Sequence, residues 1–313
     1  MIISRLSALC LAALLLVTLP GCTKIEDQVF AAAVSAGHWH AGLTVAHIPV
    51  DDINWVYLKN NWQDGQQTVV LLHGFSADKE NWTRFAGDLA DGYNLVIPDL
   101  PGHGETTQDH KLAYDIDTQA RRVLSLMSAL DIEQFHLAGN SMGGAIAART
   151  AWLAPARVST LGLFNAAGAK MADSDLDAAL KEGINPLIVK TDADMERVLG
   201  YAMAKPPFMP WPVKAVFTRR SIARAELNEK IFADLRRDNS IDQMQILHEV
   251  VARTLVLWGD QDRLLNVANA DLFVATMPYA RKVVMPGIGH LPMLEAPADT
   301  AKIYADFLAN KGI

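Results

Sequence analysis

The chain has little cysteine and no excess of positive charge, and each lack excludes a class of protein. Among its 313 residues the only cysteines are Cys10 and Cys22, so no disulfide framework holds the remainder of the chain together. The formal net charge of −7 at pH 7 excludes the broad positive field with which proteins attract nucleic acid. Half of the residues are hydrophobic, which is enough for one large core. We therefore expect one compact, enzyme-sized domain and no nucleic-acid partner.

The N-terminus resembles an export signal. Arg5 precedes a mainly apolar run over residues 6–19, which is shorter than the roughly 20 residues of a membrane-spanning helix. The sequence Leu-Pro-Gly-Cys at residues 19–22 then resembles a bacterial lipobox, although proline is unusual at its second position. We expect residues 1–21 to be a lipoprotein signal peptide and Cys22 to carry a lipid anchor on a membrane of the bacterial cell envelope. The alternatives are a secreted protein or an uncleaved N-terminal anchor, with no role for Cys22.

Strand-length apolar runs alternate with helical stretches along most of the chain. Residues 22–42 are compatible with an N-terminal anchor or linker helix, and the alternation over 43–58 predicts two antiparallel edge strands. Six runs rich in Val, Leu and Ile predict further strands, at 68–72, 94–98, 135–138, 160–164, 254–258 and 282–285. Helical patterns lie between or after them, at 117–130, 143–153 and 300–309. This order predicts an α/β domain over 43–313, with a mostly parallel eight-stranded sheet and helices on both faces.

The interval from about 168 to 250 interrupts this rhythm. It is long, helical in pattern and contains five prolines, so we expect a helical cap inserted after the sixth strand. Within it, residues 201–211 concentrate methionine and aromatic side chains. Such a segment is suited to lining an acyl pocket, touching a membrane or packing the cap onto the body.

A candidate nucleophile lies in the motif Gly139-Asn-Ser-Met-Gly143. The motif has the form G-x-S-x-G and stands directly between the predicted strand 135–138 and the predicted helix 143–153. In that context it predicts a sharp turn that lifts the hydroxyl of Ser141 clear of the sheet. The helix N-terminus favours the negative charge that develops during nucleophilic attack. The alternative is a glycine-rich turn with a solvated serine.

A second loop, His73-Gly-Phe75, follows the predicted strand 68–72. In hydrolases with the G-x-S-x-G turn, the oxyanion is bound by the N–H after the nucleophile and by one N–H from this loop. We therefore assign the backbone N–H groups of Met142 and Phe75 to the oxyanion hole. His73 is an alternative base, but its position before Gly74 favours a structural histidine that bonds the loop.

An acid and a histidine follow the serine in the chain order expected for this turn. Asp260 and Asp262 come after the predicted strand 254–258, and His290 lies in a glycine-rich loop after the last strand. We prefer Asp262 as the acid because Asp260 lies so close to the strand end that we expect it to shape the turn. His290 is the predicted general base, with Asp262 fixing its tautomer. Taken alone, His290 would be interpreted as a surface-loop histidine.

These motifs, in this order, resemble the α/β-hydrolase superfamily. Residues 73–82, 99–107 and 139–144 are more closely similar to abhydrolase-domain monoacylglycerol lipases and to bacterial membrane-associated lipases and phospholipases. The resemblance implies the α/β-hydrolase fold, hydrolysis of a carboxylic ester such as an acylglycerol or related lipid, and neither a cofactor nor a metal.

Three other functions compete with an acylglycerol lipase. Carbon–carbon bond hydrolases of the same fold share the Asn-Ser-Met-Gly-Gly turn. They carry a Gly-Pro-Gly loop after the oxyanion strand, whereas here His73-Gly74 is followed by Phe-Ser-Ala-Asp, which favours a lipase. A phospholipase A is the second alternative. The third is a lipoprotein that kept the fold as a binding module, which would be expected to have lost Ser141 or His290. We therefore predict a serine carboxylic ester hydrolase.

Overall fold

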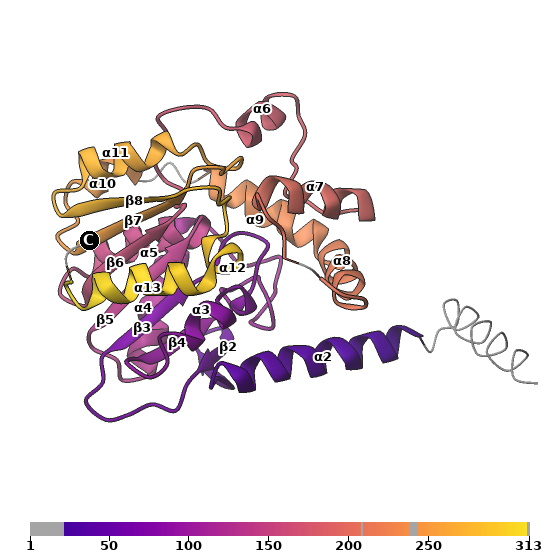
Figure 1. The fold of residues 1–313 in the computed structure, drawn as a ribbon, viewed down its shortest axis with the longest axis horizontal. Coiled ribbons are helices and arrows are strands. Elements are labelled where there is room, and N and C mark those ends of the chain that lie inside the picture. Colours follow the sequence, from indigo (N-terminus) through magenta and orange to yellow (C-terminus); the bar gives the residue numbers. More distant parts are fainter. Residues whose placement is uncertain (1–21, 208, 238–242, 312–313) are drawn as a thin grey trace, which may run out of the picture.

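The computed structural model describes residues 22–207, 209–237 and 243–311 (Figure 1). Its centre is an eight-stranded sheet in the order β1-β2-β4-β3-β5-β6-β7-β8. The strands are β1 Thr44–Val50, β2 Ile53–Lys59, β3 Thr68–Leu72, β4 Asn94–Pro98, β5 Phe135–Asn140, β6 Val158–Phe164, β7 Arg253–Gly259 and β8 Ala280–Met285. β1 and β2 are antiparallel to each other and β2 is antiparallel to β4, whereas β3 to β8 pair in parallel. The predicted mostly parallel sheet is confirmed.

Helices cover both faces of the sheet. The helices are α2 Cys22–His40, η2 Lys79–Trp82, α3 Thr83–Gly87, α4 Ile116–Ala129, α5 Met142–Leu153, α6 Asp175–Lys181, α7 Asp192–Ala202, α8 Val213–Ala223, α9 Ala225–Arg237, α10 Gln243–Leu247, α11 Ala268–Thr276, α12 Pro292–Glu295 and α13 Pro297–Leu308. Side chains of β3 alternate between two cores, Val70 and Leu72 in one, Val69 and Leu71 in the other. The first core contains α4, α5 and α11, and the second contains α3 and α13.

The elements differ from the prediction mainly at their ends. β3 and β4 have the predicted bounds, and β5 extends two residues further, to Asn140 beside the candidate nucleophile. Every residue of β5 is buried. Because glycine and asparagine are depleted in strands, propensity alone ends the strand too early. Tertiary pairing of Gly139 and Asn140 with β6 continues it.

The segment between β6 and β7 carries the helices α6 to α10, and we refer to it as the cap (Figure 1). α10 packs back against α5 and α11 of the body. α2 extends away from the sheet and packs against the cap helix α8 as well as against α3. Within the described ranges, no helix combines the length and the hydropathy needed to cross a membrane. The predicted signal peptide lies outside the described residues, and only the backbone of Cys22 is described.

Candidate active site

Ser141 occupies a strained turn between β5 and α5. Its φ of 54° and ψ of −119° lie outside the regions that residues with a side chain normally adopt. A Cβ at Gly139 would lie 2.1 Å from the carbonyl oxygen of Gly143. A Cβ at Gly143 would lie 2.4 Å from the carbonyl oxygen of Leu72. The strand and the helix therefore pass too close for any side chain at these positions, which explains the spacing of the motif.

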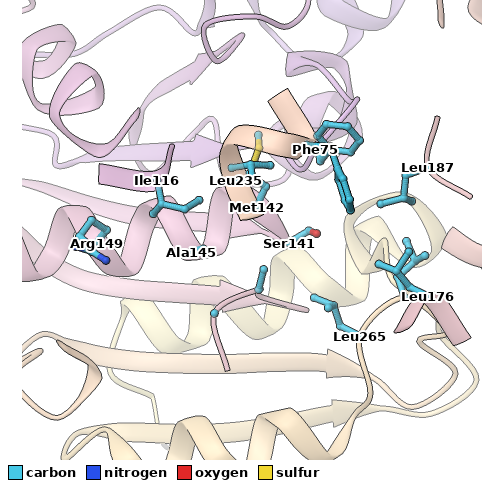
Figure 2. A pocket seen from close by; sticks show the side chains of 14 residues that line it. Phe75, Ile116, Ser141, Met142, Ala145, Arg149, Leu176, Leu187, Leu235 and Leu265 are labelled. Carbon is cyan, nitrogen blue, oxygen red and sulfur yellow. The ribbon is translucent and has the colours of Figure 1, made fainter. Parts of the chain in front are cut away.

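The loop after β3 passes directly beside this serine. A Cβ on Gly74 would lie 3.2 Å from the Cβ of Ser141. Phe75, Ser141 and Met142 line the same cavity, and the hydroxyl of Ser141 points into it (Figure 2). Met142 is the first residue of α5, so its N–H has no carbonyl four residues back within the helix. The structure thus brings both candidate oxyanion-hole residues to the candidate nucleophile.

His73 precedes Gly74 in this loop, and each of its ring nitrogens forms a hydrogen bond with the backbone. Its Nδ1 donates to the carbonyl oxygen of Gly74 at 2.8 Å, and its Nε2 accepts the N–H of Leu100 at 2.9 Å. Complete burial lowers the pKa of His73 to about 4, so the ring stays neutral near pH 7. Both nitrogens are therefore used to hold loops, which supports the structural interpretation over the role of base.

His290 and Asp262 form a buried pair. Nδ1 of His290 lies 2.8 Å from Oδ2 of Asp262, and both side chains are almost fully shielded from solvent. The other carboxylate oxygen, Oδ1, accepts the N–H groups of Leu264 and Leu265 at 2.8 and 2.9 Å. The N–H of His290 donates to the carbonyl of Ala202 at 2.8 Å, at the end of the cap helix α7. These contacts fix the carboxylate, orient the imidazole toward it and tie the backbone of His290 to the cap.

Two buried asparagines hold this pair and were missed in the sequence. Asn165 donates from Nδ2 to Oδ2 of Asp262 at 2.7 Å and to the carbonyl of Gly289 at 3.3 Å. Asn140 donates from Nδ2 to the carbonyl of His290 at 3.0 Å. A signal existed for both, since Asn140 lies inside the G-x-S-x-G motif and Asn165 directly follows the sixth predicted strand. Their side chains join the ends of β5 and β6 to the loops of the acid and the base.

Asp260 has a different role from Asp262. Its Oδ1 accepts the N–H of Gly287 at 2.7 Å, in the loop that leads to His290. The sequence suggested that Asp260 shapes the turn after the strand through its own backbone. In the structure its side chain also binds the neighbouring loop. Asp260 directly follows β7, whose last residue Gly259 pairs with Met285 of β8. The local sequence does not show that these two strands are neighbours.

Glu295 is a further residue near the site whose role the sequence did not indicate. Its Oε1 accepts the N–H of Gly289 at 3.0 Å, and its Oε2 accepts the N–H groups of Ala204 and Lys205 at 2.9 and 3.0 Å. One carboxylate thus ties the cap to the loop that carries His290.

The cavity beside Ser141 has a volume of about 270 Å³ and is lined mainly by apolar side chains. Its lining consists of Phe75, Ile116, Ser141, Met142, Ala145, Arg149, Ala167, Gly168, Leu176, Leu187, Phe232, Leu235, Leu264 and Leu265. The described part of the 201–211 segment does not contribute, and Met203 instead packs against Leu264, which favours the packing alternative. Across the residues that the structure describes, no three His, Cys, Asp or Glu side chains cluster in a way that could hold a metal ion.

Comparison with known proteins identifies the family. The profile of the alpha/beta hydrolase family matches residues 69–303. Lipase 1 of Psychrobacter immobilis is 32% identical over 309 residues, covering 96% of this chain and 97% of the relative. Lipase 3 of Moraxella sp. (strain TA144) is 36% identical over 255 residues, 80% of either chain. A crystal structure of a membrane phospholipase A, described as a bacterial virulence factor, has a TM-score of 0.89 at 35% identity and covers 98% of this chain and 97% of that chain. The chain therefore belongs to the alpha/beta hydrolase family.

Proposed function

We propose that this carboxylic ester hydrolase is a lipase that works through an acyl-enzyme on Ser141. The observation that carries the proposal is the strained turn that directs the Ser141 hydroxyl into an apolar cavity. The buried pair of His290 and Asp262 supports it, since a base oriented by a carboxylate is what activates a serine. The similarity to two bacterial lipases over 80% or more of the chain supports it further.

In this mechanism His290 moves the protons. Nδ1 of His290 donates to Asp262, which leaves Nε2 to take the proton of Ser141 as its oxygen attacks the ester carbonyl. The carbonyl oxygen becomes an oxyanion, bound by the N–H groups of Met142 and Phe75. The alcohol leaves with the proton from His290, and an acyl-enzyme remains. Water deprotonated by His290 then attacks the acyl-enzyme, and the acid departs as Ser141 regains its proton.

The substrate we propose is an acylglycerol or a related lipid ester. Apolar side chains line the cavity around Ser141, and few polar groups are present to bind a hydrophilic acid. A phospholipase A activity is the second candidate, because the similarity to the membrane phospholipase A spans nearly the whole of both chains. Both candidates share the same acyl-enzyme and differ in the alcohol that leaves.

We also propose that the enzyme works at a membrane of the cell envelope, held by a lipid on Cys22. Five exposed residues with small or apolar side chains follow one face of α2 at helical spacing, namely Ile25, Val29, Ala32, Ala36 and Trp39. The opposite face of α2 packs on the cap, where Arg219 contacts Glu26 and Asp27 at 2.9 and 2.7 Å. An amphipathic helix directly after a lipidated residue is suited to lie on a bilayer surface.

The test of catalysis compares the wild-type protein with Ser141→Ala. The assay uses p-nitrophenyl esters, emulsified acylglycerols and phospholipid vesicles. Ser141→Ala should lower kcat by roughly 10⁴-fold or more and should abolish labelling by a fluorophosphonate. Relative rates on acylglycerols and phospholipids separate the two candidate activities. Labelling that persists in the mutant would show that another residue is the nucleophile, and a wild-type protein inactive on every ester would contradict the proposal.

The test of the anchor compares the wild-type protein with Cys22→Ser in cell membranes. Wild-type protein should need detergent for its release, whereas the variant should be released by salt or remain soluble. Mass spectrometry of the mature N-terminus should detect acyl groups on Cys22. A mature chain that keeps residues 1–21, or that begins elsewhere without lipid, would contradict this part of the proposal.

A further inference from the structure

One face of α5 forms a wall of the cavity beside Ser141. Ser141, Ala145 and Arg149 follow each other at four-residue spacing, so they lie on the same side of the helix. Figure 2 shows them in a row along α5, with Arg149 at the far end. Leu176 and Leu187, from the cap, lie on the other side of Ser141 (Figure 2). Lining residues therefore lie on both sides of Ser141. We call the side lined by Ala145 and Arg149 the α5 arm and the side lined by Leu176 and Leu187 the cap arm.

Arg149 gives the α5 arm a polar end. The residue is only 1% exposed, and its Nη1 lies 3.5 Å from Oδ1 of Asp117. Its guanidinium also lies 5.7 Å from the ring of Trp152. Elsewhere the arm is apolar, with Ile116 among its lining residues. Covering a buried cation with a hydrocarbon chain is unfavourable, so a chain that enters this arm should stop before it reaches the guanidinium.

The arm has a definite length. Eight residues separate Ser141 from Arg149, which at 1.5 Å per residue places their backbones about 12 Å apart. Long side chains on a helix lean toward its N-terminus, so the guanidinium shortens the arm. An extended hydrocarbon with bonds of about 1.5 Å advances roughly 1.3 Å per carbon, so about nine carbons span this distance. A fully inserted chain of sixteen carbons is therefore longer than the α5 arm.

We propose that Arg149 is the floor of the acyl pocket and limits the acyl chain to at most about nine carbons. This inference rests on the proposed ester hydrolysis at Ser141 and assigns the α5 arm to the acyl group. The cap arm then receives the alcohol. Ala145 is the second determinant, because its small side chain leaves the arm open one helical turn beyond the serine.

The test measures kcat/KM for p-nitrophenyl esters from acetate to palmitate, so that only the acyl chain changes. The wild-type enzyme should prefer chains of about six to eight carbons over palmitate. Arg149→Met keeps the length of the side chain but removes its charge, and it should raise the laurate-to-butyrate ratio about tenfold. Ala145→Leu fills the arm near Ser141 and should lower the octanoate-to-acetate ratio by tenfold or more.

Arg121→Met is the matched control. Arg121 contacts the same Asp117, with Nε 2.7 Å from Oδ2, but its side chain is 64% exposed and does not line the cavity. The Arg121→Met variant should therefore leave the chain-length profile unchanged. A wild-type preference for palmitate over octanoate would overturn the proposal. An unchanged chain-length profile in a folded Arg149→Met protein would also overturn it. If that variant fails to fold, an unchanged profile in Ala145→Leu would overturn the proposal instead.

These outcomes are separable from a failure of the proposed function. Loss of the limit that Arg149 sets changes the ratio of kcat/KM between long and short esters but leaves hydrolysis dependent on Ser141. Failure of the proposed function would appear as an absence of ester hydrolysis in the wild-type protein, or as activity that survives Ser141→Ala.

Discussion

The body around β5 and α5 and the cap between β6 and β7 differ in how tightly their backbones are held. Every residue of β5 is buried, whereas the cap helix α6 contains no buried residue. Glycines show the same contrast, because a Cβ at Gly139 or Gly143 would meet backbone atoms within 2.5 Å, but one at Gly183 or Gly200 in the cap would meet nothing within 4 Å. The body thus holds the backbone around Ser141 in close packing, whereas α6 and these two glycines of the cap are packed more loosely.

The cap and the body meet at the loop that carries His290. The carbonyl of Ala202 accepts the N–H of His290, and Glu295 binds two N–H groups just beyond α7. A movement of this end of the cap would therefore act directly on the backbone of His290. The contrast between the two regions predicts where substitutions should affect catalysis, folding or neither.

The largest effect is expected at the two carboxylates after β7. Asp262→Asn should lower kcat by about 10³- to 10⁴-fold, since an amide cannot hold the imidazole in the productive tautomer or stabilise its cationic form. Asp260→Asn should change kcat only a few-fold, because Asp260 binds the N–H of Gly287 and not the imidazole. Steady-state kinetics on a p-nitrophenyl ester, with circular dichroism as a control for folding, measures both. Equal losses in the two variants would show that the acid was misassigned.

An intermediate effect is expected from alanine at two glycines. Gly143→Ala places its Cβ 2.4 Å from the carbonyl of Leu72 and should destabilise the protein by about 3 kcal/mol or more. Gly200→Ala, inside the cap helix α7 and with open space around it, should stabilise by about 0.5–1 kcal/mol. Urea denaturation gives both free energies of unfolding. A Gly143→Ala protein as stable as the wild type would refute the close approach of strand and helix.

The smallest effect is expected on the stability of the fold at acidic pH, and we expect it from a histidine of the body. Burial lowers the pKa of His136 on β5 to about 4, below the usual value of 6.5. Between these values the unfolded chain binds the extra proton, so stability is complete above pH 6.5 and declines as the pH falls toward 4. The contribution is on the order of 2 kcal/mol.

Replacing this histidine tests its share of the decline. His136→Asn should flatten the loss of stability between pH 6.5 and 4, measured by urea denaturation at several pH values. His248→Asn is the matched control, because that histidine is exposed at the end of the cap and should leave the slope unchanged. An equally steep slope in His136→Asn would remove His136 from the acid response.

Much of the fold could be predicted because its signals are local. The bounds of β3 and β4 follow from short runs of β-branched and aliphatic residues between polar ones. The alternation before them predicted β1 and β2 as an antiparallel pair at the edge. In contrast, β5 was predicted too short, because pairing with β6 overrides the low strand propensity of Gly139 and Asn140.

The sequence by itself determined the turn at Ser141, because the glycines that permit it lie within two residues of the serine and act through backbone sterics. The sequence also limited the candidates for the acid partner of His290 to Asp260 and Asp262. Only the tertiary structure decided which of them meets His290, how Asn165 contacts Asp262 from 97 residues away, and that Arg149 lines the cavity beside Ser141. These contacts join segments whose spacing along the chain carries no information on their spacing in the fold. Sheet order and helix packing alone determine which of them touch.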